Sequence, residues 1–325
     1  MRNDLRFIDL CAGVGAGRVG LESNGLQCVG FSEIDKDAEY TYRTLHGDEC
    51  AFGDLTKIDT KNLPEFELLI GGFPCQTFSI IGDRCGLNDE DRGQIIYHIA
   101  RILKDTESKY FILENVKGLV NHNGGRTFKI VLDLLSKLNY EIHFSVLNSL
   151  DYGVPQMRER IYIVGIKQDI LRTRKSFVFP IKENSPIDIS EFLCDTRDEF
   201  VFNKKHRNYA TFDKYLNNKY NKNKYDLADF LSEDYIVLDT RQSDLRIYKQ
   251  KVPTIRRGRQ GILYTKNGEL RKLSGYEAFL LQGFDKEMAM KATNEQTNSK
   301  LLAQAGNAMT INVIDAITKE LMKAI

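Results

Sequence analysis

A glycine-rich turn close to the N-terminus constrains the fold of this chain more than any other stretch. The segment from Phe7 to Leu10 has the apolar character of a buried strand, and Cys11-Ala12-Gly13-Val14-Gly15-Ala16-Gly17 follows it directly. Glycines let the backbone approach a ligand closely, and the helix that such a turn opens offers unpaired N–H groups. A second strand over 28–32 ends at Glu33, roughly 20 residues after the glycines, where a carboxylate can hold ribose hydroxyls. The pattern predicts an α/β sheet that binds NAD, FAD or S-adenosylmethionine (SAM), and a tight structural turn is the alternative.

A single cysteine marks the next break in the apolar pattern. The run Phe66–Ile70 has strand length, and Gly71-Gly72-Phe73-Pro74-Cys75-Gln76-Thr77-Phe78-Ser79 then breaks it. Ligands bind at the carboxyl ends of strands in open α/β sheets, so Cys75 is well placed for a nucleophile. The polar segment from Cys75 to Gln94 is typical of a mobile active-site loop. A buried structural cysteine is the alternative reading of Cys75.

Acidic residues stand at two further strand ends. Asp54 follows Phe52-Gly53 at the end of an expected third strand, where its carboxylate could meet an adenine amino group. The apolar strand Tyr110–Val116 carries Glu114 near its end, so Glu114 and Cys75 could face one pocket. Taken alone, Glu114 could equally be a helix N-cap or a surface acid.

Two arginines precede the apolar strand Ile161–Gly165. Arg158 and Arg160 alternate with Glu159, and strand spacing would place both arginines on one face. There they could bind a phosphate or a base carbonyl oxygen, whereas a surface ion-pair strand is the alternative. Helices are expected over 119–138 and 273–282, and a final helix is expected to open at Gln304 and run to Ile325.

Composition sets the size and the compartment. The 325 residues, with 42% hydrophobic and 28% charged, suffice for one large soluble domain plus a smaller one. No apolar run reaches the length of a membrane span, and the N-terminus lacks signal-peptide character. The cysteines at 11, 28, 50, 75, 85 and 194 form no Cys-x-x-Cys pair, and the histidines add no ligand spacing. We therefore expect neither a metal site nor a disulfide framework, and a cytoplasmic protein.

The charge is unevenly distributed along the chain. Residues 1–170 carry 19 Lys/Arg against 25 Asp/Glu, a net −6, whereas residues 171–260 carry 19 against 13, a net +6. The basic part contains the Lys-, Asn- and Tyr-rich segment 203–225 and the stretch Arg256-Arg257-Gly258-Arg259-Gln260-Gly261. Such side chains suit base edges and phosphates. A second domain over 186–275 that docks an anionic partner is expected; a solvated lysine-rich surface is the alternative.

Together these stretches resemble the cytosine-5 DNA methyltransferases over nearly the whole chain. The motifs occur in the family's order: Asp9-Leu10-Cys11-Ala12-Gly13-Val14-Gly15 for the SAM loop, Gly72-Phe73-Pro74-Cys75-Gln76 for the nucleophile, Glu114-Asn115-Val116 for the acid, Gln156-Met157-Arg158-Glu159-Arg160 for the paired arginines, and Arg271 to Phe284 with Gly306-Asn307-Ala308 as the closing motifs. Two positions depart from the family. Cys11 stands where many members have Phe, and Ile34 replaces an aromatic residue of some relatives, so smaller apolar groups would sandwich the adenine.

The resemblance implies a doubly wound, Rossmann-like SAM-dependent methyltransferase sheet with a smaller inserted target-recognition domain. The catalytic domain would comprise 1–185 and 300–325, the target-recognition domain 186–275, and a hinge 276–299. The cofactor contacts implied are Asp9, Cys11, Ala12, Gly13, Gly15, Glu33, Ile34, Asp54, Pro74 and Asn307. The catalytic residues implied are Cys75, Glu114, Arg158 and Arg160. DNA contacts are expected from Gln76, Ser79, Arg256, Arg257, Arg259 and Gln260.

The implied chemistry explains these residue types. Cytosine C5 is a weak nucleophile, and a Cys75 thiolate that adds to C6 turns the ring into an enamine that accepts a methyl group from SAM. Glu114, as the acid, would bind N3 and the exocyclic amine, and Arg160 would bind O2 with Arg158 in support. Because the target atom lies inside the duplex, the base must be flipped out, at about a few kcal/mol. Double-stranded DNA is the expected substrate, no metal is needed, and a monomer with a cognate restriction endonuclease is expected.

Three other functions fit parts of the pattern. Relatives of this fold methylate cytosine in tRNA, although the sizeable basic domain favours DNA. An NAD(P)-dependent oxidoreductase would use the first glycine turn but would leave Cys75, Glu114 and the arginine pair without a role. A catalytically silent DNA-binding protein would not need Cys75 and Glu114.

Overall fold

The computed structural model describes the chain except for residues 1–4, 48–49, 75–94, 172–175, 183–185 and 242–244. The chain divides into two compact units. Unit 1 comprises Met1–Asn148, Glu159–Lys182 and Ala308–Ile325, and unit 2 comprises Ser149–Arg158 and Glu183–Asn307. The range predicted for target recognition, 186–275, lies in unit 2, as does the range 276–299 predicted as a hinge.

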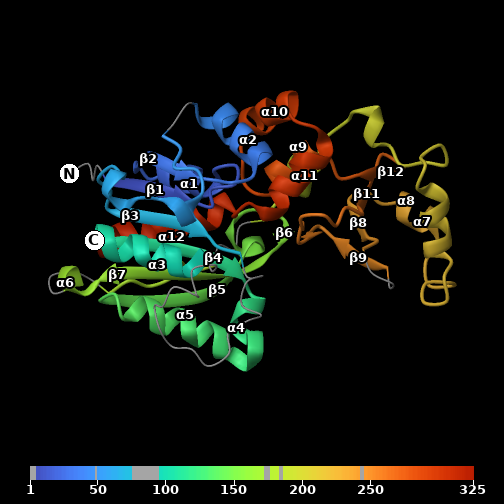
Figure 1. The fold of residues 1–325 in the computed structure, drawn as a ribbon. Coiled ribbons are helices and arrows are strands. Elements are labelled where there is room, and N and C mark those ends of the chain that lie inside the picture. Colours follow the sequence, from blue (N-terminus) through green and yellow to red (C-terminus); the bar gives the residue numbers. More distant parts are fainter. Residues whose placement is uncertain (1–4, 48–49, 75–94, 172–175, 183–185, 242–244) are drawn as a thin grey trace. The chain divides into compact units, whose positions relative to one another are not determined.

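Unit 1 is built on a six-stranded sheet. Its order is β2-β1-β3-β4-β7-β5 (Figure 1). The strands are β1 (Arg6–Leu10), β2 (Gln27–Ser32), β3 (Leu68–Gly72), β4 (Tyr110–Val116), β5 (Tyr140–Asn148) and β7 (Glu159–Lys167). Strands β2, β1, β3 and β4 are parallel, whereas β7 pairs antiparallel with both β4 and β5. The carboxyl ends of β1 to β4 therefore meet at one edge, as the sequence predicts.

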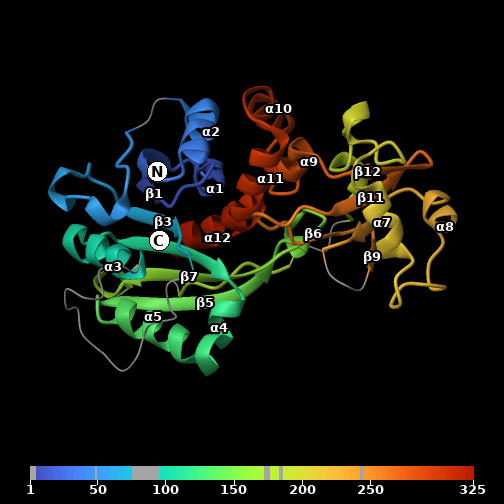
Figure 2. The same ribbon diagram turned by 45° about the vertical axis from the view of Figure 1, so that its right-hand side comes forward.

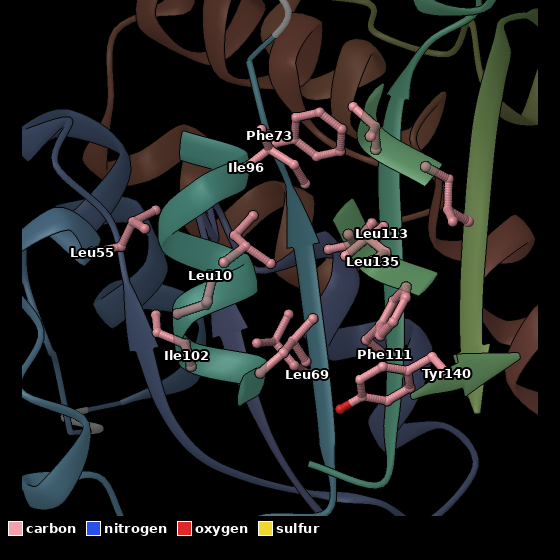
Figure 3. Packing of buried hydrophobic residues seen from close by; sticks show 14 of the residues in the cluster. Leu10, Leu55, Leu69, Phe73, Ile96, Ile102, Phe111, Leu113, Leu135 and Tyr140 are labelled. Carbon is pink, nitrogen blue, oxygen red and sulfur yellow. The ribbon is translucent and has the colours of Figure 1, made fainter. Parts of the chain in front are cut away.

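Helices cover both faces of this sheet, because its strands are apolar on both sides. On one face, α3 (Ile95–Thr106) and α5 (Arg126–Ser136) pack with alternate residues of β1, β3 and β4 into a buried cluster (Figure 3). On the other face lie α1 (Ala16–Glu22) and α12 (Ile311–Ala324). A Cβ added to Gly20 would come within 2.7 Å of the Ile314 side chain, so α1 and α12 are in close contact. The predicted doubly wound α/β architecture is confirmed.

Shorter elements complete unit 1. Asp35 caps α2 (Lys36–His46) by accepting hydrogen bonds from the backbone N–H groups of Asp37 and Ala38. Tyr42 of α2 stacks on Phe31 with ring centroids 3.8 Å apart, which holds α2 against β2. The other elements are η1 (Leu55–Lys57), η2 (Thr60–Asn62), α4 (Gly118–Asn121), η5 (His122–Gly125) and α6 (Gln168–Leu171).

Three predicted elements differ from the structure. The helix expected over 119–138 is interrupted between α4 and α5, because Asn123, Gly124 and Gly125 adopt positive φ angles of 51°, 67° and 86°. The strand expected before Asp54 is reduced to a single bridge between Phe31 and Ala51. The final helix does not open at Gln304: this residue lies inside α11 (Asn298–Asn307), and α12 begins separately after the extended residue Thr310.

Unit 2 has a small antiparallel sheet of its own, in the order β12-β11-β8-β9 (Figure 1). Figure 2 shows β9, β11 and β12 of this sheet with α7 and α8 from a second direction. Its strands β8 (Ile236–Asp239), β9 (Arg246–Lys249), β11 (Ile262–Lys266) and β12 (Glu269–Lys272) pack with α7 (Tyr209–Leu216) and α8 (Leu227–Leu231) around a buried cluster. The two-residue strands β6 (Gln156–Met157) and β10 (Val252–Pro253) pair in parallel. The remaining elements are η6 (Ser149–Tyr152), η7 (Ile189–Glu191), η8 (Asp198–Phe200), α9 (Gly275–Leu280), α10 (Lys286–Glu295) and α11. Within the described residues, no helix combines the length and apolar character of a membrane span.

Candidate active site

The glycine turn after β1 is held by the acid at the end of β2. The Gly13 N–H donates to Glu33 Oε2 at 2.7 Å, and the N–H groups of Ile34 and Asp35 donate to Glu33 Oε1 at 2.8 Å each. Gly15 has a φ of 80°, and a Cβ there would lie 2.2 Å from His46 Nε2. Glu33 therefore shapes the turn, and its half-buried carboxylate keeps further lone pairs for hydroxyl donors.

Asp9 is the buried acidic residue beside this turn. Its side chain is 1% exposed, and neither carboxylate oxygen accepts a hydrogen bond of normal geometry from the described residues, although the Arg18 backbone N–H approaches it. Burial raises its pKa to about 8; Arg18 opposes this rise and Glu33 adds to it. A buried carboxylate without partners is costly in a folded chain, and a bound ligand with N–H or O–H donors would supply them.

The small residues of the turn line the same region. Burial, with the Glu33 and Asp9 carboxylates, raises the pKa of the Cys11 thiol to about 12, so this thiol stays protonated and acts as an apolar group. Ala12 is buried against Phe31 and Tyr42. Ile34 is 69% exposed, so its side chain is accessible for a contact.

Asp54 lies beside the end of β2, although it does not end a strand. The Phe52 N–H donates to the Phe31 carbonyl at 2.7 Å, and Ser32 Oγ donates to the Gly53 carbonyl at 2.5 Å. The Asp54 carboxylate caps η1 by accepting from the Thr56 side chain and N–H, and these bonds, together with Lys57, lower its pKa. Glu33 and Asp54 thus gather at one edge of unit 1, with Asp9 at the end of β1.

Glu114 and Arg160 meet at the ends of two neighbouring strands. Glu114 Oε1 lies 2.9 Å from Arg160 Nε, and the two side chains are 10% and 12% exposed. Antiparallel pairing of β4 with β7 produces this contact, because Val116 lies opposite Arg160 and Glu114 lies opposite Tyr162. The structure brings these two predicted site residues together in a largely buried ion pair.

The end of β3 lies beside this pair. Gly72 lies opposite Glu114 in the sheet, and a Cβ on Gly72 would be 3.6 Å from Glu114 Oε2. The Asn115 side chain donates to the Phe73 carbonyl at 2.8 Å, which ties the end of β4 to the segment that enters the cysteine loop. Pro74 is exposed at this point. Cys75, Gln76 and Ser79 lie outside the described residues.

Arg158 is placed differently from Arg160. It lies between β6 and β7 and belongs to unit 2, so the expectation that both arginines share one strand face is wrong. Its side chain is 2% exposed and donates to the carbonyls of Ile255 at 3.1 Å and Gly306 at 3.2 Å. Asn307, the predicted cofactor residue that follows Gly306, is exposed at the end of α11.

Four of the six predicted DNA-contacting residues form an exposed loop of unit 2. Arg256, Arg257, Arg259 and Gln260 are all exposed between β10 and β11. The loop borders a pocket of about 470 Å³ whose described lining includes no Asp or Glu. The polar and charged residues that line it are His206, Asn208, Thr211, Tyr215, Thr240, Arg256, Arg259, Gln260, Lys272 and Asn298. Lys272 Nζ lies 3.2 Å from His206 Nε2, so the pocket has a cationic character that suits an anion.

Comparison with known proteins identifies the family. Residues 5–323 match the family described as C-5 cytosine-specific DNA methylase. The chain belongs to this family. It is 35% identical to the Type II methyltransferase M.SsoII of Shigella sonnei over 98% of this chain and 80% of that protein. It is also 35% identical to the Type II methyltransferase M.NgoBI of Neisseria gonorrhoeae over 97% of this chain and 92% of that protein.

Solved structures agree on the fold. The S. pombe Dnmt2 methyltransferase superposes with a TM-score of 0.68 at 16% identity, covering 98% of both chains. A prophage-encoded E. coli protein described as a DNA modification methyltransferase gives a TM-score of 0.69 at 21% identity, covering 98% of this chain. The protein is a SAM-dependent DNA cytosine-5 methyltransferase. It is therefore not the NAD(P)-dependent oxidoreductase that its glycine turn alone would also allow.

The residues of this methyltransferase fit the cofactor of its family. The orphaned Asp9 carboxylate, the Gly13–Glu33 turn and the exposed Ile34 offer an acceptor, a curved backbone and an apolar surface at one sheet edge. Among the described residues, no cluster of His, Cys, Asp and Glu could hold a metal ion. Sequence reasoning gave no role to Asn115 or Gln156, whose side chains bind backbone groups 42 and 125 residues away, and no local pattern signals such contacts.

Proposed function

We propose that this methyltransferase flips a cytosine out of duplex DNA, attacks its C6 with Cys75 and methylates its C5. The observation that carries the proposal is the Glu114–Arg160 pair, which lies beside the strand end that leads, three residues after Gly72, to Cys75. A carboxyl and a guanidinium at this point match the two edges of cytosine that must be held during attack.

Each side chain has one task in this scheme. The Cys75 thiolate forms a bond to C6, and Arg160 donates to O2. Glu114 takes up a proton from solvent as the cytosine enters, donates it to N3 and accepts a hydrogen bond from the exocyclic amine. Arg160 faces Glu114 through Nε, so the other N–H groups of its guanidinium would provide the donor for O2. Loss of the C5 proton then expels Cys75 and restores the thiolate. Arg158 is proposed as a supporting residue that does not touch the base.

The cofactor site is proposed for the edge formed by β1 and β2. SAM supplies an electrophilic methyl group when it is bound. Glu33 would accept hydrogen bonds from the ribose hydroxyls, and Asp54 would accept one from the adenine amino group. Asp9 would accept a hydrogen bond from another donor group of the cofactor. Gly13, Gly15, Cys11, Ala12 and Ile34 would line the site, with Pro74 and Asn307 as further contacts.

Unit 2 is proposed to bind the DNA. Its Arg256–Gln260 loop and the cationic pocket beside it would meet phosphates and base edges, and flipping one base costs about a few kcal/mol that such contacts offset. Gln76 and Ser79 are proposed as further contacts near the flipped base. Because flipping one base needs only one active site, we propose that the enzyme is a monomer. We also propose that it acts in the cytoplasm.

A restriction–modification role is proposed from the relatives. Those that match most of this chain are described as Type II methyltransferases, so we propose a cognate endonuclease for the same site. The test is to incubate the enzyme with labelled SAM and mixed-sequence duplex DNA, with tRNA as a parallel substrate. We expect 5-methylcytosine in DNA at one short sequence context. Label only in tRNA, or in neither substrate, would refute the proposal.

A further inference from the structure

The Arg256–Gln260 loop, which we call the recognition loop, has exposed side chains on a tightly held backbone. At its start, the Ile255 N–H donates to Gln156 Oε1 at 3.0 Å, and Thr254 Oγ1 donates to the Met157 carbonyl at 2.5 Å. Both partners belong to the short strand β6, which pairs with β10. The loop is therefore held at its root by a segment about 100 residues earlier in the chain.

Arg158 continues this attachment and adds a third segment. Its planar guanidinium donates through Nη1 to the Ile255 carbonyl and through Nη2 to the Gly306 carbonyl, at 3.1 and 3.2 Å. One buried side chain thus joins the residue before the recognition loop to the residue before Asn307. A lysine keeps the charge but lacks the rigid fork that spans two carbonyls.

Gly306 also touches the loop directly. A Cβ on Gly306 would lie 2.3 Å from the backbone nitrogen of Arg257 and 2.6 Å from the carbonyl carbon of Arg256. The loop backbone therefore rests on the last turn of α11 with no room for a side chain between them. This close approach explains why the segment before Asn307 and the recognition loop cannot shift independently.

A second arginine holds the loop from the sheet. Arg241 donates to the Thr254 carbonyl at 2.8 Å and is itself fixed by Asp239, 2.7 Å away. The Thr240 N–H and hydroxyl both donate to the Gly261 carbonyl, at 2.9 and 2.8 Å. The backbone of the loop is thus anchored at both ends, while its side chains are exposed.

We propose that Arg158 is a positioning residue for sequence recognition. It holds the recognition loop at a fixed position relative to the segment before Asn307. The inference rests on the proposed function of the loop in DNA contact. Because base readout requires donors placed to a fraction of an ångström, a loosened root would blur the choice of site before it abolished methyl transfer. Arg158 would also connect site recognition to the proposed cofactor contact Asn307.

The competing explanation is that Arg158 only stabilises unit 2. Arg271 provides a matched control, because it is also buried at 5% and also bonds a backbone carbonyl, that of Arg197 at 2.7 Å, together with Glu269. R158K and R271K should lower the stability of unit 2 alike. R241K, which loosens the same loop from the other side, keeps the test decisive where R158K fails to fold.

The experiment uses the full chain and two readouts. Amide hydrogen exchange is followed over residues 254–261, and the ratio of kcat/KM between the preferred site and the next-best site is measured on duplex DNA. We expect R158K and R241K to speed exchange in this segment about tenfold and to reduce the ratio about tenfold, whereas R271K changes neither. R158K should also weaken SAM binding severalfold, and R241K should not.

The outcomes separate cleanly. If R158K exchanges amides over residues 254–261 at the wild-type rate and keeps the wild-type kcat/KM ratio between the two sites, the inference is overturned. Where R158K does not fold, the same result in R241K overturns it. Equal SAM affinity in R158K and R241K would contradict the link through Gly306. Absence of methylation by the wild type would sink the proposed function alone, because the exchange measurement needs no DNA and still decides whether Arg158 positions the loop.

Discussion

The Glu114 carboxylate and the Arg160 guanidinium lie 2.9 Å apart, on strands that pair antiparallel and beside the end of β3. Both groups are nearly buried, so removing one charge leaves the other without its partner in a poorly hydrated place. The contact would hold the proposed catalytic acid and the proposed base-binding cation in position before a cytosine arrives.

The first prediction concerns the acid. Glu114→Gln keeps the shape of the side chain but cannot donate a proton to N3, so the rate of methyl transfer should fall about 10²- to 10⁴-fold. SAM affinity should stay within about twofold, because Glu114 is not among the proposed cofactor contacts. Single-turnover transfer and equilibrium SAM binding are measured on the same preparation. Wild-type transfer by this variant would remove Glu114 from the mechanism.

The second prediction follows from the buried Asp9. Its folded-state pKa of about 8 lies above the ordinary aspartate pKa of 3.8, so the folded enzyme binds a proton that the unfolded chain releases between these pH values. The free energy of unfolding without SAM should therefore fall as pH rises from about 4 to about 8 and level off above. Asp9→Asn should remove this dependence and stabilise the ligand-free enzyme at pH 7 by about a few kcal/mol.

The same substitution should weaken SAM binding, because the amide cannot replace a charged acceptor. Urea unfolding from pH 5 to pH 9 and SAM titration check the two effects. An unchanged pH profile in Asp9→Asn would show that Asp9 is not the titrating group.

The third prediction compares two glycines with left-handed backbone. Gly15 and Gly25 have φ angles of 80° and 83°, but a Cβ meets His46 at 2.2 Å only at Gly15, while Gly25 faces open space. Gly25→Ala should cost about 1 kcal/mol of unfolding free energy, from backbone strain alone. Gly15→Ala should cost about 1–3 kcal/mol more and should impair SAM binding. Equal costs for both variants would mean that the turn does not rest on α2.

The fourth prediction tests phosphate contact by the recognition loop. Arg259→Ala should weaken binding of all DNA sequences and reduce the slope of log K against log salt by about 0.9 if its guanidinium meets one phosphate. Lys249→Ala is the control, because Lys249 is exposed in the same unit but pairs with Glu233 at 2.6 Å. Filter binding from 50 to 200 mM salt measures both slopes. A change in sequence preference with an unchanged slope would make Arg259 a base reader.

Sequence reasoning predicted the parts of this enzyme that depend on local pattern. Short apolar runs predicted β1 to β4. Glu33 and Glu114 were found as acidic residues near strand ends, because parallel strands present their carboxyl ends at one edge of the sheet. The Gly124–Gly125 pair was visible, but its power to end a helix depends on the positive φ angles that the fold imposes.

The remaining features depend on distant contacts. The burial of Arg158 follows from partners 97 and 148 residues away, and its charge alone suggested an exposed binding residue. The four short strands of the antiparallel sheet in unit 2 carry too few residues each for their alternation to stand out from the basic surroundings.

The most direct test of the mechanism is the nucleophile itself. Purified wild-type enzyme and Cys75→Ser are given labelled SAM and mixed-sequence duplex DNA, and 5-methyldeoxycytidine is quantified by mass spectrometry after digestion. A hydroxyl is a far weaker nucleophile than a thiolate, so we expect methylation by the wild type and at least a 10³-fold loss in Cys75→Ser, with SAM binding preserved. Turnover by Cys75→Ser at the wild-type rate would contradict the account.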